Sequence, residues 1–182
     1  MGIVEFSNKK LNSLIVIMAL VLSVSCQEDK TTKALPISDQ ELREKLIEAN
    51  IRRVQAEKVD IDSLITAKGW NMDTTGTGLR IEIYENGNGD SVKVNRMVEV
   101  EYTITMLNGD TVYTSNNQGS KQFKVGMDHI ETGIHEAVTY MRVGDKSRVI
   151  LPSHLAHGFM GDDQSIPPNA SLIYHLQILS VQ

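Results

Sequence analysis

Cysteine is nearly absent from this 182-residue sequence, which contains Cys26 alone. A single cysteine leaves no pair for an internal disulfide, so the fold must be stabilised by its hydrophobic core. The five histidines also lack the spacing of metal sites such as CxxC or HExxH. His154 and His157 lie three residues apart, but no cysteine or carboxylate pattern accompanies them. We therefore expect no metal site.

An excess of basic residues is lacking as well, since 18 lysines and arginines stand against 23 aspartates and glutamates. The net charge of −5 leaves no basic stripe that would neutralise the phosphates of a nucleic acid, and we exclude nucleic acid as a partner. The length suits one domain with additional segments and allows one well-filled core.

A long apolar run is the third absence, because the run from Leu14 to Leu22 is too short to span a bilayer. Two lysines precede it and small residues follow it up to Cys26, as in a secretory signal peptide. The position of the cysteine resembles the lipobox of bacterial lipoproteins, although Ser23 replaces the usual aliphatic residue. We predict a lipoprotein signal peptide over residues 1–25 and acylation of Cys26. The alternative is an ordinary signal peptide with an incidental cysteine.

Residues 26–37 are polar and are predicted to form a tether. Their acidic start, Gln27 to Asp29, resembles the export tag of surface lipoproteins in Bacteroidetes, and a solvated tether explains it equally well. Acylation of Cys26 would hold the protein on a membrane without spanning it. We therefore expect a location in the cell envelope outside the cytoplasm, at the periplasmic face or on the surface of the outer membrane.

A helical segment is predicted over residues 38–74. Ser38 matches an N-cap, and the apolar spacing after it predicts a helix to about Lys58. A second short helix is expected over residues 60–68, closed by Gly69.

The apolar stripes of the first of these helices need a partner. Either they pack on the chain's own domain, or residues 38–58 form the seam of a homodimer. The sequence does not decide between the two.

From residue 75 onward the apolar residues alternate, which predicts strands with one buried face. The "NGD" at residues 108–110 is typical of a tight hairpin turn. One stretch, "HIETGIHEAVTYM", has helical spacing instead. Together they predict an α+β domain of antiparallel strands with one short helix. The strands are expected at residues 79–83, 98–104, 111–114, 123–125, 147–152 and 172–178.

Two prolines, Pro167 and Pro168, stand directly before the last of these strands. Proline lacks the N–H that a central strand must donate, so the pair ends a loop rather than forming part of the strand. The sequence thus predicts a stiff loop that ends at these prolines, directly before a core strand.

The segments "VEYT", "LNGDTVYTS", "GIHEAVTYMRVGDKSRVILP" and "IPPNASLIYHLQIL" resemble the FKBP family of peptidyl-prolyl isomerases over residues 75–182. The resemblance implies an FKBP-like antiparallel sheet wrapped around one short helix, with an apolar pocket between them. The lipid-anchored form with a helical N-terminal segment resembles the gliding-motility-associated FKBP lipoproteins of Bacteroidetes.

The resemblance implies catalysis of prolyl cis–trans isomerisation on proline-containing polypeptides, as a folding factor outside the cytoplasm. This reaction needs no nucleophile and no cofactor, since its barrier of about 18–20 kcal/mol comes from amide resonance. The alternative is a non-catalytic FKBP-fold lipoprotein that binds peptides or proteins in envelope or motility machinery.

The motif also implies the pocket residues. Candidate catalytic residues are Tyr102, Tyr113 and His157, and candidate substrate-binding residues are Val112, Phe123, Ile130, Glu131, Ile134, Ile166 and Tyr174. Ile166 is expected to cover bound proline and Tyr174 to line the floor of the pocket.

Several of these residues depart from the best-known pattern of the family. Val112 replaces a common phenylalanine, Ile134 a tryptophan, and His157 a tyrosine whose hydroxyl donates to the substrate. Tyr113 stands at the place of an aspartate, and Glu131 at that of an isoleucine whose backbone N–H is the donor. A neutral His157 would still donate from one ring nitrogen, with activity changing near an ordinary histidine pKa of about 6.5. We expect reduced activity, or peptide binding with little catalysis.

Overall fold

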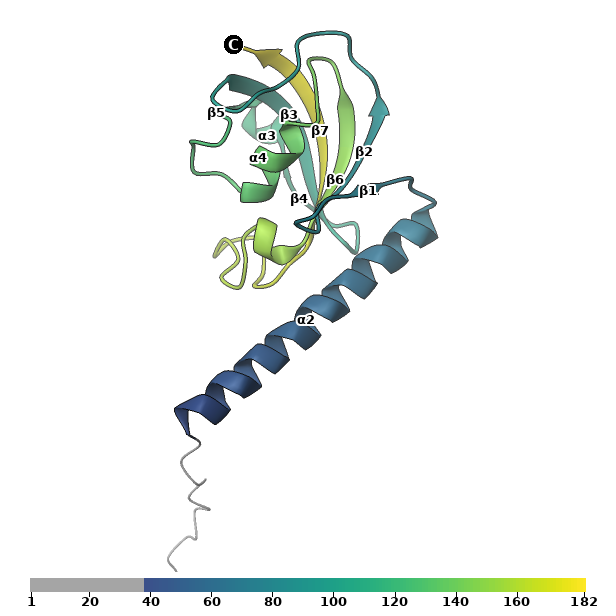
Figure 1. Ribbon diagram of the computed structural model, residues 1–182. Coiled ribbons are helices and arrows are strands. Elements are labelled where there is room, and N and C mark those ends of the chain that lie inside the picture. Colours follow the sequence, from purple (N-terminus) through teal and green to yellow (C-terminus); the bar gives the residue numbers. More distant parts are fainter. Residues whose placement is uncertain (1–37) are drawn as a thin grey trace, which may run out of the picture. The chain divides into compact units, whose positions relative to one another are not determined.

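The computed structural model describes residues 38–182 (Figure 1). The predicted signal peptide, Cys26 and the tether lie outside the described residues. Within residues 38–182, no helix is both long and apolar enough to cross a membrane. Residues 46–182 form one compact unit, and residues 38–45 are the first turns of a helix.

That helix, α2, runs without interruption from Asp39 to Lys68. The predicted division into two helices is wrong, because no proline or glycine between Ile37 and Gly69 breaks the chain of hydrogen bonds. The predicted ends are confirmed. The Ser38 hydroxyl accepts a hydrogen bond from the backbone N–H of Glu41 at 3.1 Å, and Gly69 ends the helix with φ of +65°.

Seven strands form one sheet in the order β1-β2-β6-β7-β3-β4, and β5 pairs with the first part of β3. Every pairing is antiparallel, as the sequence predicts. The "NGD" turn joins β3 to β4, where the N–H of Met106 donates to the carbonyl of Asp110 at 2.9 Å. The strands are β1 Asp73–Thr74, β2 Arg80–Glu85, β3 Met97–Met106, β4 Thr111–Thr114, β5 Lys121–Lys124, β6 Lys146–Leu151 and β7 Leu172–Val181.

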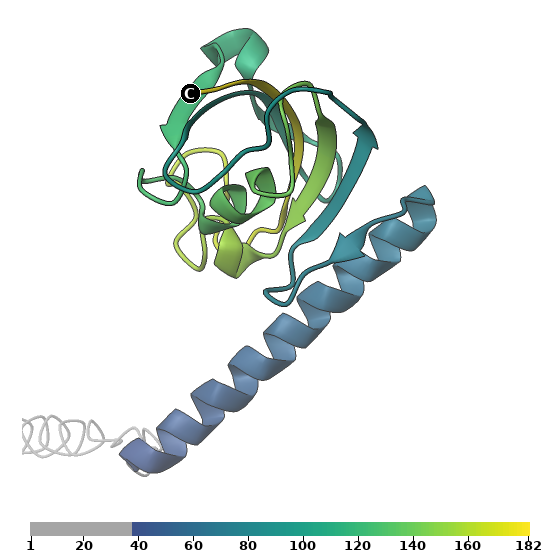
Figure 2. The ribbon, with the colours of Figure 1, turned by 45° about the horizontal axis from the view of Figure 1, so that its top comes forward.

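The sheet curves around the short helix α4, Thr132–Val138, as Figure 2 shows. The inner face carries the main hydrophobic core, to which β7 contributes Leu172, Tyr174, Leu176 and Ile178. Gly133 permits the close approach of helix and sheet, because a Cβ at this position would lie 2.5 Å from a methyl carbon of Leu151.

The outer face of β6 and β7 is also buried in part, which the alternating pattern did not predict. Ile150 and Ile173 are at most 4% exposed, and they form a second cluster with Ile61 of α2. Beside this cluster the buried guanidinium of Arg80 donates to a carboxylate oxygen of Asp62 at 2.8 Å. The second half of α2 is therefore a covering layer of the sheet.

The first half of α2 exposes apolar side chains. Leu46 and Ile51 are 61% and 62% exposed, and Ile47 and Val54 are exposed as well. Packing of this stripe on the chain's own domain is thus not observed for these four residues. A homodimer through residues 38–58 stays a prediction.

Three further elements had no counterpart in the sequence patterns. They are β1, the single turn α3 at Ser115–Gln118, and the 3₁₀ turn η1 at Ser153–Leu155. Each is four residues or shorter, below the length at which periodicity is informative. η1 belongs to the segment 152–171 between β6 and β7, which we call the rim loop.

Replacing Ile61 with alanine is expected to lower the free energy of unfolding by about 2–4 kcal/mol, because it leaves a cavity under α2. Ile51→Ala, on the exposed part of the same helix, should change it by less than about 0.5 kcal/mol. Urea unfolding of the two variants measures the difference. Equal effects would contradict the packing of α2 on the sheet.

Candidate functional site

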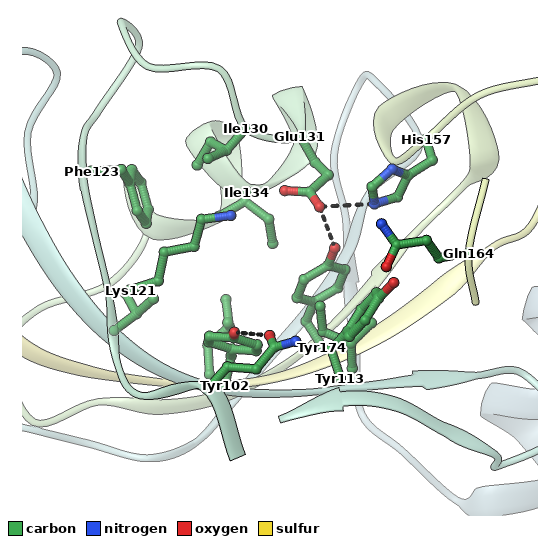
Figure 3. A pocket seen from close by; sticks show the side chains of 14 residues that line it. Tyr102, Tyr113, Lys121, Phe123, Ile130, Glu131, Ile134, His157, Gln164 and Tyr174 are labelled. Atoms are coloured by element: carbon green, nitrogen blue, oxygen red, sulfur yellow. Dashed lines mark hydrogen bonds and ion pairs between the residues drawn. The ribbon is translucent and has the colours of Figure 1, made fainter. Parts of the chain in front are cut away.

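The main cavity of the described residues lies between the inner face of the sheet and α4, and its volume is about 300 Å³. Its wall is formed by residues of β3, β4, α3, β5, α4 and β7, and of the segments that precede α4 and β7 (Figure 3). The lining residues are Val100, Tyr102, Ile104, Tyr113, Gln118, Lys121, Phe123, Ile130, Glu131, Ile134, His157, Gln164, Tyr174 and Leu176.

Most residues that the sequence motif placed in a pocket meet in this cavity. The structure brings together Tyr102, Tyr113, Phe123, Ile130, Glu131, Ile134, His157 and Tyr174. It does not place Val112 or Ile166 on the wall. Val112 packs half-buried against the core, and Ile166 is 2% exposed because the rim loop turns its side chain into the core.

The carboxylate of Glu131 is the centre of a polar cluster in the pocket. The hydroxyl of Tyr174 donates to Glu131 Oε1 at 3.0 Å, and Nε2 of His157 lies 3.0 Å from the same oxygen. Figure 3 shows the carboxylate between these two side chains. Glu131 is only 14% exposed, so the cluster lies largely away from water.

Burial raises the pKa of Tyr174 well above its usual value, and the nearby negative charge of Glu131 raises it further. Tyr174 therefore stays protonated and is a constant donor to the carboxylate.

The proton that a neutral His157 carries on Nε2 points to Glu131 and is not free for a ligand. Only the protonated ring has a second N–H, on Nδ1, that another group can accept. The expectation that neutral His157 donates to a substrate is therefore revised by this geometry.

The hydroxyls of the two other pocket tyrosines are likewise committed. Tyr102 donates to Gln118 Oε1 at 2.7 Å, and Tyr113 donates to Asp162 Oδ2. The backbone N–H of Glu131, in contrast, has no hydrogen-bond acceptor among residues 38–182. This N–H, next to the first turn of α4, is a backbone donor that the pocket leaves available, in addition to the ammonium of Lys121 and the side-chain amide nitrogens of Gln118 and Gln164.

Asp162 is a functional residue that sequence reasoning missed. Its Oδ1 accepts the backbone N–H groups of Gln164, Ser165 and Ile166 at 3.0, 2.9 and 2.7 Å, while its Oδ2 binds Tyr113. Partial burial alone would raise the pKa of Asp162, but the bonds from Tyr113 and these N–H groups outweigh it and lower the pKa to about 2. The loop thus supplies a carboxylate opposite the tyrosine that stands in place of an aspartate.

Lys121, Gln118 and Gln164 are further polar lining residues that no pattern indicated. The side chain of Lys121 extends toward Ile134 (Figure 3). The pocket therefore combines an apolar base with side chains of both charges.

His135, outside the pocket, supports its aromatic wall. Its Nδ1 accepts the N–H of Gly126 at 2.9 Å, so Nε2 carries the proton and donates to the carbonyl of Asp128 at 2.9 Å. The ring meets Phe123 edge to face, with centroids 5.7 Å apart. This histidine fixes the turn between β5 and α4.

A family model described as FKBP-type peptidyl-prolyl cis-trans isomerase matches residues 89–179, which is half of the chain. The chain belongs to the FKBP-type peptidyl-prolyl cis-trans isomerase family. The matched FKBP region contains every pocket residue from β3 to β7. It begins at residue 89, so α2, β1 and β2 lie outside the matched residues.

Curated FKBP relatives extend the similarity. A probable FKBP-type isomerase of Haemophilus influenzae is 32% identical over 115 residues, which are 63% of this chain and 47% of that protein. The FKBP-type isomerase FkpA of Aeromonas hydrophila is 28% identical over 167 residues, 85% of this chain and 62% of that protein. The chain thus spans less than two thirds of the length of either relative.

Solved structures of other FKBP proteins share the fold. A peptidyl-prolyl cis-trans isomerase from Pseudomonas syringae superposes with a TM-score of 0.62 at 23% identity, over 72% of this chain and 94% of that chain. AtFKBP13 gives a TM-score of 0.58 at 20% identity, over 62% of this chain and 99% of that chain. The FKBP-like architecture predicted from the sequence is confirmed.

Asp162→Asn is expected to destabilise the protein by about 1 kcal/mol at neutral pH, a value reduced because the carboxyl is partly exposed. A carboxyl whose pKa is lowered on folding contributes stability above its unfolded pKa, and loses it as the pH falls toward about 2. The difference between parent and variant should therefore shrink between pH 4 and pH 2.

Thermal unfolding at several pH values measures this difference. Asp163→Asn is the matched control, because its carboxyl makes no hydrogen bond within residues 38–182. A difference that stays constant down to pH 2 would show that the carboxylate of Asp162 is not the group that holds the loop.

Proposed function

We propose that the protein catalyses cis–trans isomerisation of peptide bonds that precede proline in polypeptide clients. The observation that carries the proposal is the cavity over α4, which has an apolar base and an uncommitted backbone donor, the N–H of Glu131. Membership of the FKBP-type isomerase family supports it.

The chemistry requires only that the pocket bind the twisted amide better than either planar form. Phe123, Ile130 and Ile134 offer apolar surface for the proline ring, which removes the ring and the bond next to it from water. Loss of water disfavours the charge-separated planar amide. The N–H of Glu131 would then hold the carbonyl oxygen of the substrate while the C–N bond turns.

We propose further that turnover is reduced relative to family members with the best-known pocket. The carboxylate of Glu131 and the ammonium of Lys121 bring charge to the wall, and His157 adds a polar ring. A charged wall retains water, so it strips less water from the amide. Ile134 also offers less apolar surface than the tryptophan of the best-known pattern, and the burial of such a ring is typically worth a few kcal/mol.

A second function, peptide binding without turnover, has an observation in its favour. Phe159 and Met160 of the rim loop are 74% and 65% exposed, and only Gly158 separates them in sequence from the pocket residue His157. Exposed apolar side chains beside a pocket suit the capture of unfolded chains. In this alternative the protein holds a client or a component of envelope or motility machinery.

Two variants of Glu131 distinguish the effect of its backbone N–H from the effect of its carboxylate. Glu131 has φ of −57°, which proline adopts without strain, so Glu131→Pro removes the donor. Glu131→Ala removes the same carboxylate and keeps the N–H. We expect Glu131→Pro to lower kcat/KM for a short proline peptide about tenfold or more. Glu131→Ala should stay within about threefold of the parent.

The measurement is peptide isomerisation by the full-length protein, with Tyr140→Ala as a control on an exposed residue remote from the pocket wall. Equal loss in both Glu131 variants would contradict the role of the N–H. Binding of the peptide without any turnover in the parent would favour the second function.

Location in the cell envelope follows from the predicted lipid anchor and is part of the proposal. The sequence before Cys26 supports export and acylation, which would place the isomerase where secreted chains fold. Cys26→Ser should move the protein from the membrane fraction to the soluble fraction. Fractionation after labelling with a radioactive fatty acid tests this, and label on the Cys26→Ser variant would contradict it.

A further inference from the structure

The rim loop, residues 152–171, determines one side of the pocket. It carries the lining residues His157 and Gln164, and its only regular element is the single turn η1. A loop of this length without regular structure keeps one shape only when its ends and its middle are held by specific bonds. The middle is held by Asp162.

The two ends of the rim loop meet at one side chain of α2, Glu57. Glu57 Oε1 accepts the backbone N–H of Ser153 and the hydroxyl of Ser171, both at 2.6 Å. Glu57 Oε2 accepts the Ser153 hydroxyl at 3.2 Å. Ser153 is 1% exposed and Ser171 is 6% exposed, so water cannot readily replace the carboxylate. One carboxylate therefore joins the start of the loop to its end.

A second residue of α2 reinforces this junction. Arg53, one helical turn before Glu57, donates from Nη1 to the side-chain oxygen of Asn169 in the rim loop. Asn169 has a positive φ of 60°, and its N–H donates to the carbonyl of Gly158 at 2.8 Å, beside His157. The chain of bonds from α2 thus reaches the residue next to the pocket wall.

Attachment of α2 to the sheet has contacts other than those of Glu57. The Ile61 cluster and the pair between Arg80 and Asp62 hold the helix without it. Both partners of Glu57, in contrast, lie at the two ends of the rim loop. The carboxylate is placed to hold the loop rather than the helix.

We propose that Glu57 is a positioning residue of the pocket: from a helix outside the matched family region, it closes the base of the rim loop and keeps His157 and Gln164 on the wall. The effect on turnover rests on the proposed isomerase function, whereas the effect on the loop does not. Part of the population would lose the ordered loop without Glu57. The apparent affinity for a peptide is the intrinsic affinity multiplied by the fraction of molecules with an ordered loop. The rate of isomerisation in the bound state, kcat, is unchanged.

The test compares Glu57→Ala, Glu57→Gln and the control Glu48→Ala in the full-length protein. Glu48 lies on the same helix and pairs only with Arg52 at the surface. Hydrogen exchange of the amides of Gly158 and Asn169 is measured together with kcat and KM. We expect Glu57→Ala to speed exchange of these two amides about tenfold and to raise KM five- to tenfold, with kcat within twofold.

Glu57→Gln should restore both quantities to within about twofold, because the amide oxygen accepts from the N–H of Ser153 and the hydroxyl of Ser171, and the amide nitrogen donates to the Ser153 hydroxyl. Glu48→Ala should leave both unchanged. Should Glu57→Ala fail to fold, Ser171→Ala removes one of the same bonds and should speed exchange of Asn169.

Three results would overturn the proposal: unchanged exchange in the loop, faster exchange throughout β3 and β7 as well, or no rescue by glutamine. If the parent shows no isomerase turnover, the proposed function fails, and the exchange rates still decide the role of Glu57.

Discussion

The alternation of side chains along β7 is the constraint on which both functional regions depend. Tyr174 and Leu176 point to the inner face and form the base of the pocket, while Ile173 between the core positions points outward and contacts the α2 cluster. Since β7 lies between β3 and β6, a shift of its register by one residue would exchange these two sets. The pocket and the covering helix therefore lie on opposite faces of one central strand. The rim loop leads directly into β7, and it contributes residues to the pocket wall and also bonds to α2.

The pocket differs from a simple apolar cavity because it has a carboxylate in its wall. A charge that is 14% exposed requires partners, and Glu131 has Tyr174 and His157. The Tyr174 hydroxyl and Nε2 of His157 therefore face this carboxylate, and they are not free to donate hydrogen bonds to a ligand. The hydroxyls of Tyr102 and Tyr113 likewise donate to other side chains of the protein, Gln118 and Asp162. The backbone N–H of Glu131 has no such partner among residues 38–182, and the side chain at position 131 does not alter this donor.

Much of the fold was predictable because it follows from local patterns. Alternation located β2, β3 and β7, "NGD" located the hairpin, and Ser38 and Gly69 marked the ends of α2. The family motif located eight of its ten pocket residues on one cavity. The bond between Asp162 and Tyr113 and the bonds of Glu57 could not be predicted, since these partners lie 49 and 96 or more positions apart in sequence. Burial of Ile173 was missed for the same reason, because the strand pattern does not reveal a helix that covers the outer face.

The central claim is that the inner face of β7, with the N–H of Glu131, binds the peptide around proline. Amide chemical shifts of the full-length protein, followed by NMR during titration with a short proline peptide, test it most directly. The account predicts the largest shifts at Glu131, His157 and Tyr174, with Ile61 and Ile173 unchanged. Shifts concentrated at Ile61 and Ile173, or no shift at Glu131 at saturating peptide, would contradict it.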